Sequence, residues 1–141
     1  MTTYTLNDGS LLCWSTASWH SNGDAGELRV GLRWTPEEPY AVSVEFIHRL
    51  TAPVTWTLSR DVLLDGLHCV TGYGDYQVYP ASPAWVGLFL TSPSGAATFA
   101  IEAAVLRDFL AATFHLVPAG REYAGYDMDA ELAFLLEEES A

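Results

Sequence analysis

The sequence predicts an α+β fold in which three strands and a helix occur twice, followed by a C-terminal helix. Two observations predict it. Apolar and polar residues alternate in several short segments, and after each third segment the apolar period changes to that of a helix. The 141 residues are 50% hydrophobic and 13% aromatic, enough to fill one core. We therefore expect a single domain over 1–141.

The first set of strands is predicted from this alternation at 28–34, 40–46 and 54–58. A helix over about 60–65 follows them. Ser59 is a good N-cap for this helix, Asp61 suits its first turn, and Gly66 suits its end.

The second set begins with a strand near Tyr76 and Val78. The run from Trp85 to Leu90 is apolar throughout, which is typical of a strand covered on both faces. A third strand is expected at 97–101. A helix over about 103–116 follows, with one apolar stripe, made of Leu106, Phe109, Leu110, Thr113, Phe114 and Val117.

Both ends of the chain add elements to these sets. We expect an N-terminal strand over 4–14 and a polar loop over 18–26. A last helix is predicted to begin at Asp127, a good N-cap. Its buried stripe consists of Met128, Leu132, Leu135 and Leu136.

The charge is strongly acidic, with six Arg, no Lys and a net charge of −12. Five of the Arg have an acidic residue within four positions, so we expect little free positive charge. Nucleic-acid binding and attraction to an anionic membrane surface are both disfavoured. No apolar run reaches the roughly 18 residues of a spanning helix, and the N-terminus lacks a basic start. With only Cys13 and Cys69, a cytoplasmic protein with free thiols is expected.

No motif points to catalysis, a cofactor or a metal. There is no Gly-x-Ser-x-Gly elbow and no His-Glu-x-x-His pair. Asp127-x-Asp129-x-Glu131 resembles part of a calcium loop, but a helix cap with an acidic first turn explains it better. Gly72-x-Gly74 precedes a strand, so a tight turn explains it better than a phosphate cradle. We expect a protein that is not an enzyme.

The aromatic residues have two interpretations. Most are predicted to lie in the core, namely Trp34, Phe46, Trp56, Trp85 and Phe99. Trp14 and Trp19 flank the polar loop, and Phe134 lies off the stripe of the last helix. These three are candidate contacts for a protein partner. The alternative is that another subunit of a homo-oligomer buries them.

Five segments lie in order over about 110 residues and carry a family pattern. They are Gly31-Leu32-Arg33-Trp34 with Pro39-Tyr40-Ala41-Val42; Val54-x-Trp56-x-Leu58-Ser59-Arg60-Asp61-Val62-Leu63; Gly72-x-Gly74-Asp75-Tyr76-Gln77-Val78-Tyr79-Pro80; Ser92-Pro93-x-Gly95; and Val117-Pro118-x-Gly120-x-Glu122 with Asp127-Met128-Asp129. In these segments the chain resembles the SsgA/SsgB-like sporulation and cell division proteins of spore-forming actinobacteria. The first 25 residues match nothing in the family.

The resemblance implies a whirly-like fold of two antiparallel sheets, assembled as a homotrimer. It implies a non-catalytic adaptor in sporulation-specific cell division that recruits or positions FtsZ, directly or through an FtsZ-associated division protein. Such a protein would be cytoplasmic and lie at the septum, without direct membrane insertion. The alternative function is a single-stranded nucleic-acid-binding whirly-type module. The composition argues against it, because such modules combine aromatic side chains with a basic groove.

Overall fold

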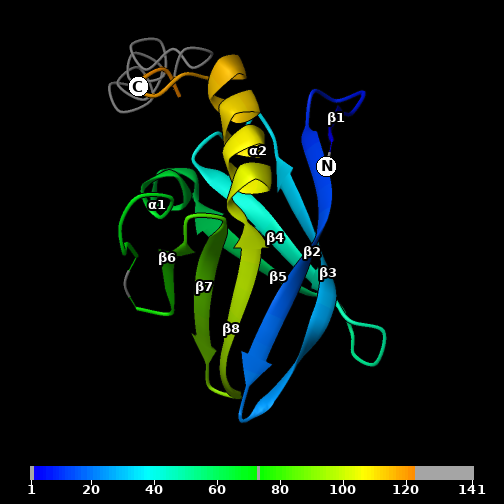
Figure 1. The fold of residues 1–141 in the computed structure, drawn as a ribbon. Coiled ribbons are helices and arrows are strands. Elements are labelled where there is room, and N and C mark those ends of the chain that lie inside the picture. Colours follow the sequence, from blue (N-terminus) through cyan, green and yellow to red (C-terminus); the bar gives the residue numbers. More distant parts are fainter. Residues whose placement is uncertain (1, 73, 123–141) are drawn as a thin grey trace, which may run out of the picture.

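Eight strands of the computed structural model form one antiparallel sheet, which curves into a half-barrel. The structure describes residues 2–72 and 74–122. Both helices lie at one end of the sheet, and the turns β2–β3 and β7–β8 lie at the other (Figure 1). The elements are β1 (Thr3–Thr5), β2 (Leu11–Ser21), β3 (Asp24–Trp34), β4 (Ala41–Ile47), β5 (Val54–Ser59), α1 (Arg60–Asp65), β6 (Tyr76–Ser82), β7 (Trp85–Ser92), β8 (Gly95–Glu102) and α2 (Ala103–Leu116).

The sheet is continuous, whereas the resemblance implied two sheets. Its strand order is β5-β4-β3-β2-β8-β7-β6, with β1 paired to the start of β2. The two halves join where residues 17–20 of β2 pair with residues 98–101 of β8. Strand β2 is long enough to pair with β3 along its whole length and with β8 along part of it. The expectation of two separate sheets is therefore wrong.

The segment expected as a polar loop, residues 18–26, is a β-hairpin instead. Strands β2 and β3 each have 11 residues and are joined at Asn22 and Gly23. These two residues have φ angles of 51° and 84°, which is the positive-φ pair that a type I′ turn needs. The expected N-terminal strand is also divided, into β1 and β2.

The two helices among the described residues begin and end where the sequence predicts, whereas the last helix, predicted to begin at Asp127, lies outside the described residues. In α1 the Ser59 hydroxyl accepts a hydrogen bond from the Val62 N–H at 3.2 Å, and Gly66 is the C-cap. Gly66 has an ordinary helical φ of −65°, so it is not needed for a left-handed turn. A Cβ there would overlap the side chain of buried Val78. Gly66 therefore lets α1 pack closely on β6.

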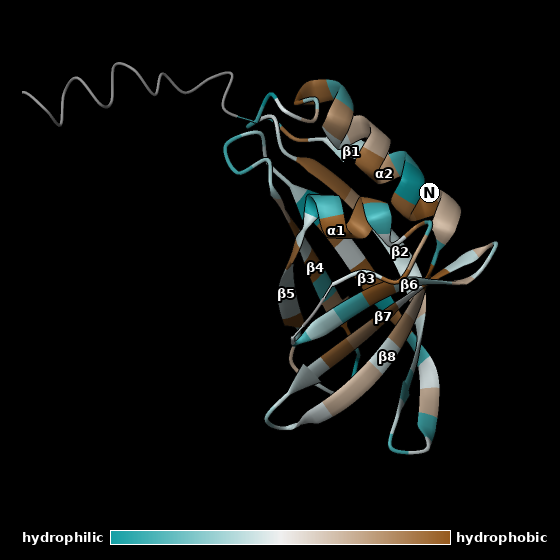
Figure 2. Cartoon of the chain, turned by 90° about the vertical axis from the view of Figure 1, so that its left-hand side faces the viewer, coloured by the Kyte–Doolittle hydropathy of each residue, from teal (hydrophilic) through white to brown (hydrophobic). Residues whose placement is uncertain are grey.

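The core lies on the concave side of the sheet, which we call the inner face. Apolar and polar residues alternate along the strands, as the bands of Figure 2 show. Trp34 and Phe46 are buried as predicted, and Trp56 and Phe99 are partly buried against the core. Trp85 is 38% exposed, so its placement in the core is wrong. Trp85 lies on the outer face of β7. The sequence predicts that both faces of this strand are covered, but its outer face is covered only in part.

A buried arginine joins the two helices. Arg60 is 1% exposed, and its guanidinium donates hydrogen bonds to the carbonyl oxygens of Thr113 (3.3 Å) and Val117 (2.8 Å). It also pairs with the Glu122 carboxylate at 3.2 Å and lies 3.9 Å from the centroid of the Phe114 ring. These contacts hold the start of α1, the end of α2 and the chain beyond it together.

Candidate functional site

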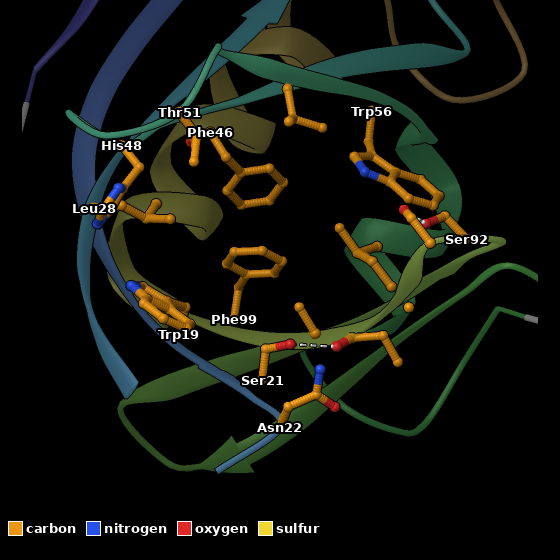
Figure 3. Close-up of a pocket in the computed structure, with 16 residues that line it drawn as sticks. Trp19, Ser21, Asn22, Leu28, Phe46, His48, Thr51, Trp56, Ser92 and Phe99 are labelled. Atoms are coloured by element: carbon orange, nitrogen blue, oxygen red, sulfur yellow. Dashed lines mark hydrogen bonds between the residues drawn. The ribbon is translucent and has the colours of Figure 1, made fainter. Parts of the chain in front are cut away.

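An open pocket lies on the inner face, at the end of the sheet away from the helices. Its volume is about 430 Å³, which is within the usual range for ligand and anchor sites. It is lined mainly by apolar side chains from six strands, including Trp19, Leu28, Phe46, Trp56, Leu90 and Phe99. We call it the apolar pocket (Figure 3).

Aromatic rings form the walls of the apolar pocket. Phe46 and Phe99 face each other with ring centroids 4.1 Å apart and planes 21° from parallel. Trp19 and Trp56 stand on opposite sides of this pair (Figure 3). Each ring projects inward because its position follows the period-2 alternation of its strand. The pocket can therefore take a flat or branched apolar group.

The mouth of the apolar pocket is partly polar. The Ser21 hydroxyl donates to the Ala96 carbonyl oxygen at 2.8 Å, which ties β2 to β8 (Figure 3). The hydroxyls of Ser92 and Ser94 bond to each other at 2.8 Å. At the start of β5, by contrast, the rim carries the apolar side chain of Val54, which is 51% exposed.

Trp19, a predicted contact residue, forms one wall of this pocket. The centroids of the Trp19 and His48 rings lie 6.1 Å apart, and the ring planes are at 89° in an edge-on arrangement. It also covers Gly26, its cross-strand neighbour, where a Cβ would come within 2.9 Å of the indole nitrogen. That buried Nε1 has no hydrogen-bond partner among the described residues.

Trp14, the second predicted contact residue, lies on the opposite, outer face of β2. Its ring lies over Gly31, where a Cβ would come within 2.7 Å of Cζ3. The Arg29 guanidinium lies 4.8 Å from the ring centroid, a cation–π contact. Trp14 is half-buried and Arg29 is exposed, so this pair presents an aromatic and cationic surface to solvent. We call it the Trp14–Arg29 surface.

A second hollow, of about 490 Å³, adjoins the apolar pocket, with which it shares Leu28 and His48. It lies where β4 ends at Ile47, and it is also lined by Arg29, Arg49 and Glu27. We call it the basic hollow.

The ion pairs differ from those expected along the sequence. Within residues 2–72 and 74–122 the carboxylates pair with two arginines, Arg33 with Asp8 at 3.9 Å and Arg60 with Glu122 at 3.2 Å. Glu37 and Asp61, which are close in sequence to Arg33 and Arg60 respectively, do not pair with these arginines. Arg29 and Arg49 pair with no described carboxylate, although each has an acidic neighbour in the sequence. The expectation of little free positive charge is therefore wrong at the basic hollow.

Cys13 and Asp8 have shifted pKa values with identifiable physical causes. Burial raises the pKa of the Cys13 thiol, which keeps it protonated. Hydrogen bonds from Ser10 lower the pKa of the exposed Asp8 carboxyl, and nearby Arg33 lowers it further. Across the described part of the chain, no three His, Cys, Asp or Glu side chains gather closely enough to hold a metal ion. The same residues include no helix with the length and hydropathy to span a bilayer.

The third predicted contact residue, Phe134, lies outside the described residues. The sequence did not predict that Trp14 and Trp19 lie on opposite faces of one strand, because a loop was expected from residue 18 onward. It also placed Phe46, Trp56 and Phe99 in the core and did not assign them to a pocket. The signal that was missed is Asn22-Gly23, which favours a tight hairpin and would have given both Trp residues a strand register.

Comparisons with known proteins agree on one family. A family model described as Streptomyces sporulation and cell division protein, SsgA, matches residues 28–122. The sporulation-specific cell division protein SsgB of Frankia casuarinae is 41% identical over 108 residues, covering 74% of this chain and 76% of that protein. SsgB of Streptomyces coelicolor is 39% identical over 111 residues, covering 77% of this chain and 81% of that protein.

Two solved structures share the fold. One is from a study of SsgB in which mutations correlate to longitudinal cell division during sporulation of Streptomyces coelicolor; its TM-score is 0.76 at 32% identity, over 83% of this chain and 95% of that one. The other is an SsgA-like sporulation-specific cell division protein from Thermobifida fusca, with a TM-score of 0.78 at 31% identity, over 92% and 98% of the two chains. The chain therefore belongs to the SsgA family of sporulation and cell division proteins.

Proposed function

We propose that this protein is a non-catalytic adaptor in sporulation-specific cell division that recruits or positions FtsZ at septum sites. The observation that carries the proposal is the family match over residues 28–122, with relatives named as sporulation-specific cell division proteins. The correlation of SsgB mutations with longitudinal division in Streptomyces coelicolor supports a role in placing the division site.

The side-chain chemistry of the described residues suits contact better than catalysis. The side-chain hydroxyls of Ser15 and Ser21 and the thiol of Cys69 each bond to a backbone carbonyl oxygen. A catalytic nucleophile would instead face a base that is held in place by a third group. The Trp14–Arg29 surface combines the two residue types that most often dominate protein–protein binding. We propose it as the surface that binds the division partner.

The charge of the chain limits how this binding can work. With a net charge of −12, the protein should repel an acidic partner such as FtsZ at long range. Affinity must then come from short-range contacts of Trp14, with Arg29 at its side. Salt screens the repulsion, since the Debye length falls from about 14 Å at 50 mM to about 7 Å at 200 mM ionic strength. We expect association to hold or to strengthen modestly over this range.

The test is a binding series between the purified protein and FtsZ at ionic strengths between these two values. Trp14→Ala should weaken binding at least about tenfold, the effect of losing a central aromatic anchor of about 1.4 kcal/mol or more. Trp85→Ala is the matched control, because Trp85 is also an outer-face tryptophan but lies on β7 and is 38% exposed. Binding that collapses with added salt, or that Trp14→Ala leaves unchanged, would reject this contact surface.

Assembly and cellular location are part of the same proposal. We propose a cytoplasmic homotrimer located at the septum during division. Any attachment to the membrane would then come through another protein. Light scattering at micromolar concentration should give three times the chain mass of 15.4 kDa. A mass equal to one chain would contradict the trimer.

A further inference from the structure

Strand β3 has an open edge along the first part of its length. Strand β2 pairs with all of β3, from residue 24 to residue 34, whereas β4 pairs only with residues 29–33. After Ile47 the chain leaves β4 in a turn, in which the Thr51 N–H donates to the His48 carbonyl oxygen at 3.3 Å. Residues 24–28 therefore have a described strand on one side only, and the β2–β3 hairpin projects beyond the end of β4 (Figure 1).

The backbone groups on this open edge can be assigned from the register of the hairpin. Ser21 and Asp24 flank the two-residue turn Asn22-Gly23, so they are the hydrogen-bonded pair that closes it. Because the direction of the backbone groups alternates along a strand, the N–H and C=O groups of Ala25 and Glu27 point away from β2. Both residues are exposed. An edge of this kind can accept an extended peptide as a further strand.

A hollow lies on each face of the sheet beside this edge. The apolar pocket is on the inner face. The basic hollow is on the outer face, where Arg29 is in register with Thr16 and Ile47. The two hollows share Leu28, on the open edge, and His48, directly after β4. A strand added at the edge would send alternate side chains into the two hollows, because successive side chains of a strand point to opposite faces.

The lining of the two hollows restricts the sequence of such a strand. Its inner-face side chains would meet the aromatic and aliphatic lining of the apolar pocket, which favours apolar residues. Its outer-face side chains would lie beside Arg29 and Arg49, neither of which pairs with a described carboxylate. Glu27 lines the same hollow and offsets one of these two positive charges. The remaining positive charge favours acidic residues on this face.

We infer that the open edge of β3 binds an extended segment of a partner protein, which adds as an antiparallel strand and alternates apolar with acidic residues. Its backbone pairs with Ala25 and Glu27, its apolar side chains enter the apolar pocket, and its acidic side chains lie beside Arg29 and Arg49. Arg29 also belongs to the Trp14–Arg29 surface, so the two surfaces are continuous. The inference goes beyond the proposed function, because it states how a segment is held, whichever protein supplies it.

Binding of a designed peptide to the full-length protein tests this inference. The probe is a fluorescently labelled peptide of about seven residues in which Val and Asp alternate. The control peptide has the same residues in one block of Val and one block of Asp. By fluorescence anisotropy at about 150 mM ionic strength, we expect the alternating peptide to bind at least about fivefold more tightly. Equal affinities would overturn the inference.

Backbone methylation of the probe distinguishes an added strand from a peptide that only fills the hollows. In an antiparallel ladder, directly opposite residues share a face and exchange their backbone hydrogen bonds. The Asp residues lie opposite Ala25 and Glu27, so N-methylation of Asp should abolish binding and N-methylation of Val should not. Equal effects of the two modifications, or a loss only on methylating Val, would contradict the added strand.

Amide hydrogen exchange followed by NMR locates the bound peptide. At a peptide concentration of about ten times Kd, the amides of Ala25 and Glu27 should exchange about tenfold more slowly. Those of Thr55 and Thr57, in the edge strand β5, should not change. Slower exchange only in β5 would overturn the inference. So would protection of Ala25 and Glu27 before the peptide is added, which would identify a second copy of the chain as the occupant if it increases with protein concentration.

Charge variants test the contribution of the basic hollow. Arg49→Glu should weaken peptide binding about fivefold or more. Arg107→Glu is the matched control, because it changes the net charge equally at an exposed residue of α2, at the other end of the sheet. Glu27→Gln should strengthen binding. Equal effects of the two arginine variants, or weaker binding with Glu27→Gln, would contradict the charge match. None of these measurements involves FtsZ, so their outcome is independent of the proposed function.

Discussion

The ion pair between Arg60 and Glu122 should contribute more to stability than any exposed pair in the described structure. Both side chains are almost fully buried, at 1% and 8% exposure, and their nitrogen and oxygen atoms lie 3.2 Å apart. Replacing Glu122 by Ala leaves the Arg60 charge buried with two carbonyl acceptors and the Phe114 ring. Breaking a buried pair in this way costs about 3–5 kcal/mol.

We take the lower end of that range, about 3 kcal/mol, because the two carbonyl hydrogen bonds remain. For a chain of this size, 1 kcal/mol corresponds to about 4 °C in Tm, so Glu122→Ala should melt about 12 °C lower. Glu122→Gln keeps an oxygen acceptor and loses only the charge. Its cost should be about 1 kcal/mol, the difference between a charged and a neutral hydrogen bond, or about 4 °C.

Thermal unfolding followed by circular dichroism measures both variants. Asp8→Asn is the matched control, because the Asp8–Arg33 pair is 3.9 Å long and both side chains are more than half exposed. It should leave Tm unchanged within the error of the measurement. A Tm for Glu122→Ala within about 2 °C of the unaltered chain would refute the reasoning, as would equal shifts for the buried and the exposed pair.

Three further predictions follow from the geometry. Gly66→Ala should destabilise the protein by about 1–3 kcal/mol in urea unfolding because the new Cβ overlaps Val78, although helix propensity alone favours Ala; an increase in stability would show that β6 moves aside. Cys69 should react promptly with a thiol reagent and Cys13 only on unfolding, because Cys13 is buried and its pKa is raised; two fast thiols per chain would contradict this placement. Labelled single-stranded oligonucleotides should show no specific binding by fluorescence anisotropy at low salt; micromolar binding that weakens as salt rises would favour the nucleic-acid-binding alternative.

Local signals in the sequence predicted most of the elements. The two helices are identified at their ends by Ser59, Gly66 and Pro118, and the period of the strands fixes which side chains face the core. The hairpin of β2 and β3 was missed because much of its far half is exposed and polar, as at His20 and Asp24, so it lacks the apolar alternation of a strand. Only its turn residues indicated that a hairpin forms there.

The contacts that define the surfaces come from residues far apart in the sequence. The apolar pocket brings Trp19 of β2 next to Phe99 of β8, and no spacing rule connects them. The same holds for Arg60 and Glu122, where the sequence favoured a neighbouring acidic residue. Trp85 was placed wrongly because an apolar run does not show whether anything covers its outer side. Periodicity assigns a face to a side chain, but only the strand order assigns its neighbours.

The central claim, an adaptor that places the division machinery, is tested most directly in sporulating cells. Fluorescent fusions of this protein and of FtsZ should be followed together by time-lapse microscopy through sporulation. We predict that the protein is present at future septum sites before or together with FtsZ. We also predict that Trp14→Ala reduces this co-localisation and Trp85→Ala does not. Absence of the protein from division sites throughout development would contradict the function.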